Sequence, residues 1–147
     1  KDFHKNFYNY NSLGKSVSEA RLEADFIVAS QASGVATVKC AEAWGGTDFR
    51  PEMKNVNVPT LIIHGDADSI VPIATSAQQA AKGIANNQYE VISDAPHGLN
   101  ATHAEELNKL LIDFLKRTFS NYKKMKCFTG VFSQNSKIFL TLQKQIF

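Results

Sequence analysis

An acid and a histidine, Asp68 and His97, follow two apolar stretches at points where strands are expected to end. Residues 60–64 read TLIIH and precede a tight turn at Gly65, and residues 89–92 read YEVI. Asp68 comes just after the first stretch, and the loop after the second carries His97. A carboxylate can accept a hydrogen bond from one imidazole nitrogen, which leaves the other nitrogen to serve as a general base. These residue types therefore predict an acid–base pair.

The segment between the two expected strands has the period of a helix. Its apolar residues recur at i, i+4, i+7, i+8 and i+11, at Ile73, Ala77, Ala80, Ala81 and Ile84. A strand–helix–strand crossover makes the two strands parallel. Parallel strands share one carboxyl end, where open α/β sheets place their active sites. We therefore expect Asp68 and His97 to lie at the same edge of the sheet.

Two other interpretations of the acidic stretch compete with this one. Asp66 lies one residue after Gly65 and is expected to stabilise the turn, but it is also a second candidate for the acid. Asp66 and Asp68 together imitate the D-x-D motif of haloacid-dehalogenase-type phosphatases. That motif has Thr or Val two residues after the second aspartate, where this chain has Ile70, and it lies near the N-terminus. Asp68 is therefore preferred as the acid, and a role limited to capping its own turn is the simpler alternative.

The remaining histidines are expected to be structural. His64 falls at the end of a buried strand, and His103 falls in the first turn of the last expected helix, where the helix dipole disfavours a charged imidazole. His64, Asp66, Asp68 and His97 would suit a metal ion by residue type, but no spacing among them matches a known ligand motif. The sequence thus predicts neither a metal nor another cofactor.

The residues HGDADSIVP at 64–72 and APHG at 95–98 resemble the C-terminal half of the α/β-hydrolase fold. With DFRP at 48–51 and THAEE at 102–106, the resemblance is specific to the cofactor-free (non-haem) haloperoxidase and aryl esterase family. It implies that Asp68 is the triad acid and His97 the triad base. It also implies that Ile70, Val71 and Phe3 line the acyl pocket.

The resemblance implies a serine hydrolase that acts on small carboxylic esters or makes peracids from peroxide, without haem or metal. Such a fold needs roughly 250 residues, and its nucleophile lies on a G-x-S-x-G elbow before the acid and the histidine. The 147-residue sequence contains no G-x-S-x-G. We therefore expect the C-terminal part of an α/β-hydrolase, with parallel strands and crossover helices after a helical lid. Its partners would be the N-terminal half and a small ester or carboxylic acid substrate. An inactive remnant that serves as an interaction or oligomerisation module is the alternative.

Three segments are expected along the chain. Residues 1–48 form the lid, with one helix from an S-x-x-E capping box at Ser16 to about Gln31 and another over 35–43. Residues 49–117 form the hydrolase core. Residues 118–147 form a basic tail outside the family pattern, of which 137–147 could be a helix or a strand.

Charge and hydropathy limit the function classes. Residues 1–115 carry 9 basic and 14 acidic residues, whereas residues 116–147 carry 7 basic residues and no acid. The basic residues lack the clustering of a nucleic-acid-binding stripe, so no nucleic-acid partner is predicted. No apolar stretch reaches 18 residues, so no membrane span is predicted.

Two dissimilar cysteines, Cys40 and Cys127, indicate a reduced, cytoplasmic setting. A homo-oligomer is possible.

Overall fold

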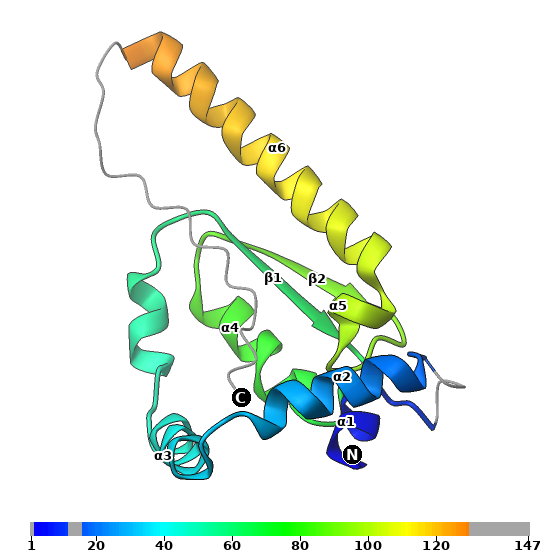
Figure 1. The fold of residues 1–147 in the computed structure, drawn as a ribbon. Coiled ribbons are helices and arrows are strands. Elements are labelled where there is room, and N and C mark those ends of the chain that lie inside the picture. The colour runs from blue at the N-terminus through cyan, green and yellow to red at the C-terminus, as the bar shows by residue number, and fades with distance from the viewer. Residues whose placement is uncertain (1, 12–15, 130–147) are drawn as a thin grey trace.

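The computed structural model describes residues 2–11 and 16–129 (Figure 1). Within them, β1 (Thr60–Gly65) and β2 (Asn87–Ile92) form a parallel two-stranded sheet. Both strands were predicted, and each is slightly longer than expected. The predicted α/β fold with parallel strands and a crossover is confirmed.

The register of the sheet brings the two strand ends level. Gly65 pairs with Ile92, and the Asp66 N–H donates to the Ile92 carbonyl oxygen at 3.2 Å. One residue later, the Ala67 N–H donates to the carbonyl oxygen of Ala95 at 3.2 Å. A Cβ on Gly65 would lie only 2.0 Å from that Ala95 oxygen, so the close approach requires glycine. The loops that follow the two strands therefore begin side by side.

The helix between the two strands is shorter than predicted. A 3-10 turn, η2 (Ile73–Thr75), precedes helix α4 (Ala77–Gly83). Ser76 lies between them with φ −123° and ψ −91°, outside the helical region. The single helix predicted from residue 73 onward is therefore two helical segments, because the backbone of Ser76 leaves the helical conformation between them.

The sheet packs against a helix on each face. Ile62 packs with Ala77 and Ile84 of the α4 layer. Its neighbour Ile63 packs with Ile92 and Leu107 on the opposite side, under α6. Neighbouring strand residues point to opposite faces, and a parallel sheet covered on both faces is rich in aliphatic residues. The core therefore has three layers (Figure 1).

Within residues 93–129, two helices follow the loop after β2. These are α5 (Leu99–Thr102) and α6 (Ala104–Thr129). Helix α6 runs through residue 117 without a break and extends past the strands (Figure 1). The predicted boundary between core and tail thus falls inside one helix, and the predicted element at 137–147 lies outside the described residues. In the described part of the chain, no helix combines the length and the apolar character needed to cross a membrane.

In the described residues before β1, the structure has four helical elements. They are α1 (Asp2–Phe7), α2 (Glu19–Ser30), α3 (Gly34–Gly45) and the 3-10 helix η1 (Arg50–Asn55). Helices α2 and α3 correspond to the two that were predicted. Helix α1 was not predicted, because its aromatic residues show no clear period.

The predicted start of α2 is wrong by two residues. Ser18, not Ser16, is the N-cap, and its hydroxyl accepts the Arg21 N–H at 3.1 Å. The Ser16 hydroxyl instead donates to the Tyr8 carbonyl oxygen at 2.7 Å. Tertiary contact with the preceding segment therefore decides which serine caps the helix.

A further buried cluster joins α1 to α2 at the carboxyl end of the sheet. Phe7, Tyr8, Tyr10 and Leu22 are each at most 5% exposed and pack together. Helix α3, in contrast, buries none of its residues. The predicted lid therefore contacts the rest of the described chain mainly through the segment around Phe7–Tyr10.

Candidate active site

Asp68 and His97 meet at the carboxyl end of the two strands. The Nδ1 atom of His97 lies 2.7 Å from Oδ2 of Asp68, and the two side chains are 10% and 4% exposed. An ionised carboxylate only accepts hydrogen bonds, so Nδ1 carries the hydrogen. The turn after β1 supplies the acid and the loop after β2 supplies the histidine. The structure thus brings together the two residues that the sequence singled out.

The other oxygen of Asp68 is held by its own turn. Oδ1 accepts the Ile70 N–H at 2.9 Å and the Val71 N–H at 2.8 Å. This is the local aspartate turn that sequence reasoning offered as the simpler alternative, and here it coexists with the contact to His97. Ile70 and Val71 are half-buried beside the pair. That their side chains line an acyl pocket stays a prediction.

His64 is a third member of this network. Its side chain is 2% exposed, and its Nε2 lies 2.9 Å from the Val71 carbonyl oxygen and 3.2 Å from Oδ2 of Asp68. Sequence reasoning assigned His64 a structural role, because the residue falls at the end of an expected buried strand. No sequence signal indicated its contact with Asp68, because a four-residue spacing predicts a side-chain contact on a helix and not between a strand and the turn after it.

Hydrogen bonding keeps Asp68 ionised. Burial by itself would raise the pKa of this carboxyl group. The hydrogen bonds from His64, His97 and the Val71 N–H, together with the charge of His97, outweigh burial and hold the pKa of Asp68 well below its usual range. The carboxylate is therefore negatively charged at neutral pH, as an acid that stabilises an imidazolium must be.

Asp66 and His103 have other partners. The Asp66 side chain is exposed, and its Oδ1 accepts the Asp94 N–H at 2.7 Å. Asp66 thus ties the two loops together, while Asp68 makes the contact with His97. Nδ1 of His103 lies 2.8 Å from the Thr102 hydroxyl, between α5 and α6.

The turn after α1 contacts both loops of the pair. The Phe7 ring meets the His97 ring edge to face, with centroids 4.9 Å apart. Asn9, at φ 48°, donates from Nδ2 to the Ala67 carbonyl oxygen at 2.8 Å. Sequence reasoning missed both residues, because they lie far from the acid and the histidine along the chain. They place the N-terminal helical segment directly against Asp68 and His97.

Phe3, the third predicted pocket residue, lies on α1. Its side chain is 48% exposed, and its ring centroid is 6.3 Å from that of Phe7. The role of Phe3 in an acyl pocket stays a prediction.

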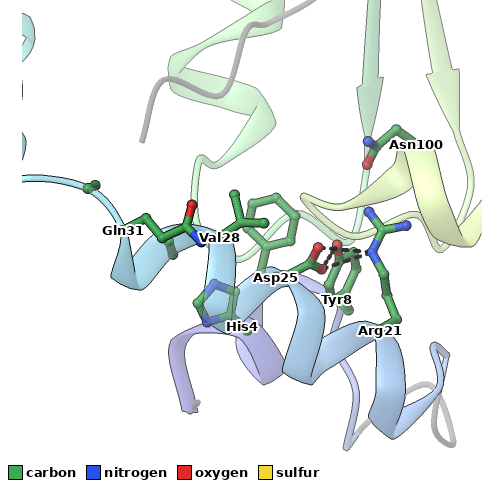
Figure 2. A pocket seen from close by; sticks show the side chains of 10 residues that line it. His4, Tyr8, Arg21, Asp25, Val28, Gln31 and Asn100 are labelled. Atoms are coloured by element: carbon green, nitrogen blue, oxygen red, sulfur yellow. Dashed lines mark hydrogen bonds and ion pairs between the residues drawn. The ribbon is translucent and has the colours of Figure 1, made fainter.

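A cavity of about 500 Å³ is lined by residues of α1 and α2, by Tyr8 and by Asn100 (Figure 2). In its wall the Tyr8 hydroxyl donates to Asp25 at 2.6 Å, and Arg21 Nε pairs with the same carboxylate at 3.0 Å. Burial and the hydrogen bond to Asp25 raise the pKa of Tyr8 to about 12. The Arg21 and Asp25 charges thus offset each other within the wall.

The described residues hold no cluster of three His, Cys, Asp or Glu side chains arranged to bind a metal ion. Around Asp68 the two imidazoles direct N–H groups toward the carboxylate. A metal ligand would need a lone pair at those nitrogens. The network therefore has the form of a hydrogen-bonded acid–base system.

A family model described as PET hydrolase-like matches residues 24–144, which is more than half of the sequence. The chain belongs to the PET hydrolase-like family. The predicted resemblance to α/β-hydrolases of the cofactor-free haloperoxidase and esterase type is thereby confirmed.

Relatives of this PET hydrolase-like chain carry haloperoxidase and esterase names. A putative non-heme chloroperoxidase from Synechocystis sp. is 44% identical over 78% of the chain and 41% of that protein. A bifunctional esterase/perhydrolase from Acinetobacter calcoaceticus is 32% identical over 75% of the chain and 40% of that protein. The chain thus spans about 40% of the length of these curated relatives.

A solved structure supports the same fold. The crystal structure of bromoperoxidase from Bacillus anthracis matches the PET hydrolase-like chain with a TM-score of 0.75 at 41% identity. The match covers 78% of the chain and 42% of the bromoperoxidase. The two chains therefore share both the fold and a substantial part of their sequence.

Proposed function

We propose that Asp68 and His97 are the acid and base of a Ser-Asp-His triad in a hydrolase of small carboxylic esters. The 2.7 Å contact between Nδ1 of His97 and Oδ2 of Asp68 carries this proposal. With the hydrogen on Nδ1, the neutral ring accepts the proton of a nucleophilic hydroxyl at Nε2. Asp68 stabilises the resulting imidazolium, which then gives the proton to the departing alcohol.

The nucleophile in this proposal comes from a segment that the 147 residues do not include. The sequence has no G-x-S-x-G elbow, and its matches cover only about 40% of the length of these relatives. Water would release the acid from the acyl-enzyme, and peroxide in its place would give a peracid. The esterase/perhydrolase name of one relative supports both outcomes for this site.

A chimaera tests the proposal. Residues 1–117 would replace the portion of the Bacillus anthracis bromoperoxidase that they match, and hydrolysis of p-nitrophenyl acetate would be followed. We expect ester hydrolysis that His97→Gln reduces by about 10⁶ and Asp68→Asn by about 10⁴ in turnover, as in serine-protease triads. The 147-residue chain alone should not exceed the uncatalysed rate.

His103→Gln provides the matched control, since it changes another histidine of the same region that contacts Thr102. Its turnover should stay within a few-fold of the unmodified chimaera. Full activity of the His97→Gln chimaera would overturn the assignment of the base. Hydrolysis by the 147-residue chain alone, lost on Asp68→Asn, would mean that one of its own serines is the nucleophile.

An interaction or oligomerisation module is the second candidate function. Several large apolar side chains on α2 and α3 are at least half exposed, among them Val28, Val35 and Trp44 at 68%, 74% and 70%. Such a group of exposed apolar residues favours a protein partner, either the N-terminal part of the hydrolase or a second copy. Light scattering of the purified chain would distinguish a monomer from a homo-oligomer. Cell fractionation would test the proposed cytoplasmic location.

A further inference from the structure

His64 lies on β1, directly beneath the contact between Asp68 and His97. Its Nε2 faces two oxygen acceptors, the Val71 carbonyl at 2.9 Å and Oδ2 of Asp68 at 3.2 Å. A carbonyl and a carboxylate both accept hydrogen bonds, so Nε2 must carry a hydrogen. The side chain is 2% exposed and sits in the packed layer of the sheet. His64 is therefore a rigid N–H donor aimed at the acid.

The four contacts of the Asp68 carboxylate divide into two pairs. Oδ1 receives the backbone N–H groups of Ile70 and Val71, and Oδ2 faces the ring nitrogens of His64 and His97. The two backbone N–H groups hold Oδ1 in place. Rotation of the carboxylate about Oδ1 would still move Oδ2. His97 comes from a loop, whereas His64 comes from a strand. His64, as the strand residue, is therefore the donor that fixes the position of Oδ2.

We propose that His64 is a positioning residue that directs Oδ2 of Asp68 toward Nδ1 of His97. The proposal deepens the proposed function, since it rests on Asp68 being the triad acid. A histidine that only filled the core would need no contact beyond the Val71 carbonyl. The approach to Oδ2 and the double use of Val71, whose N–H binds Oδ1 while its carbonyl accepts from His64, join the ring to both the acid and its turn.

Three substitutions separate positioning from space filling. In His64→Gln the side-chain nitrogen lies as many bonds from Cα as Nε2 does, so it can donate to both acceptors. In His64→Asn the amide is too short to reach them. In His64→Leu the volume is largely kept and the donor is lost. Only the glutamine variant should therefore behave like the unmodified chain.

Nuclear magnetic resonance of the full 147-residue chain gives the readout. The ¹⁵N shifts of His97 report which nitrogen carries the hydrogen in the neutral ring, and the ¹³C shift of the Asp68 carboxyl group reports its titration. We expect a single Nδ1–H tautomer in the unmodified chain and in His64→Gln. In His64→Asn and His64→Leu we expect a mixture of tautomers, and the pKa of Asp68 should rise by about one pH unit, as for the loss of one hydrogen bond to a charged group.

A folded His64→Leu chain with an unchanged His97 tautomer and an unchanged Asp68 titration would overturn the proposal. If His64→Leu does not fold, the comparison of His64→Gln with His64→Asn decides, and identical spectra for these two variants would overturn it as well. The measurement needs no catalysis. An inactive chimaera with the expected tautomer pattern would therefore count against the proposed function and leave the positioning role supported.

Discussion

The carbonyl oxygen of Phe7 accepts the backbone N–H of Gly98 at 2.9 Å. This bond joins the end of α1 to the residue directly after His97. The Phe7 ring also contacts the His97 ring, so one residue of the N-terminal segment holds the histidine loop through its backbone and through its side chain. The N-terminal segment and the acid–base pair are therefore one packed unit.

Gly98→Ala should loosen this unit. A Cβ at Gly98 would lie 2.3 Å from two ring carbons of Tyr8 and 2.8 Å from the Phe7 ring. Both rings are buried and have little room to move, so we expect a loss of about 1–3 kcal/mol in the free energy of unfolding. Urea denaturation would measure it. Gly34→Ala is the matched control, because a Cβ there meets nothing within 4 Å, and it should change stability by less than about 1 kcal/mol.

Asn9 should stabilise the folded chain through both its side chain and its backbone conformation. Its Nδ2 donates to the Ala67 carbonyl oxygen, next to Asp68, and its φ of 48° lies in the left-handed region. Asn9→Gly removes the hydrogen bond and keeps that conformation accessible, at a cost of about 1 kcal/mol. Asn9→Ala also adds the left-handed penalty of about 1–2 kcal/mol. Urea denaturation would measure both costs. Equal stabilities of Asn9→Gly and Asn9→Ala would show that the left-handed conformation adds no cost of its own.

Asp68 should make the stability depend on pH in the acid range. Its pKa is lower in the folded chain than the usual value near 4 in the unfolded chain. The unfolded chain therefore binds more protons between these two values. The contribution of Asp68 is fully present above about pH 4 to 5 and is lost as the pH falls toward the folded pKa.

Asp68→Asn should accordingly lower the free energy of unfolding by about 3–5 kcal/mol at pH 7, since it breaks a buried pair, and by less as the pH falls. Urea denaturation between pH 3 and pH 7 would measure the difference. Asp48→Asn is the control. Hydrogen bonds from Arg50 lower the pKa of Asp48 to about 2, but both residues are exposed, so solvent screening should leave the stability at pH 7 nearly unchanged. A pH-independent effect of Asp68→Asn would refute the expectation.

Tyr8 should lose its contribution to stability only at strongly alkaline pH. Burial and the hydrogen bond to Asp25 raise its pKa to about 12, from about 10 in the unfolded chain. The contribution is complete below pH 10 and is lost as the pH rises through 12. Absorbance titration of the phenolates should show a tyrosine that ionises near pH 12 and that Tyr8→Phe removes.

Tyr89→Phe is the matched control for Tyr8→Phe. The Tyr89 hydroxyl is buried with no hydrogen-bond partner among the described residues. Its removal should be neutral or slightly stabilising, whereas Tyr8→Phe should cost about 1.5–3 kcal/mol through the lost bond to a carboxylate. A similar cost for both substitutions, measured by urea denaturation at pH 7, would show that the bond to Asp25 contributes nothing.

Local sequence patterns predicted the parallel strands and the edge at which Asp68 and His97 lie. The apolar run over residues 60–64, the aspartate turn at Asp68 and the position of His97 after a second strand depend on interactions between near neighbours. The break at Ser76 and the choice of Ser18 as the N-cap of α2 were not predictable in this way. Both depend on backbone geometry and on contacts made after the chain has folded.

The sequence by itself thus determined that an acid and a histidine would share one sheet edge, because a crossover makes strands parallel whatever surrounds them. The tertiary structure alone decided which other groups meet that pair. Asn9 and Ala67 are 58 residues apart, Phe7 and Gly98 are still more distant, and His64 reaches Asp68 only because the turn folds back over β1. Such contacts depend on how separate elements pack, and no local pattern of residue types encodes that packing.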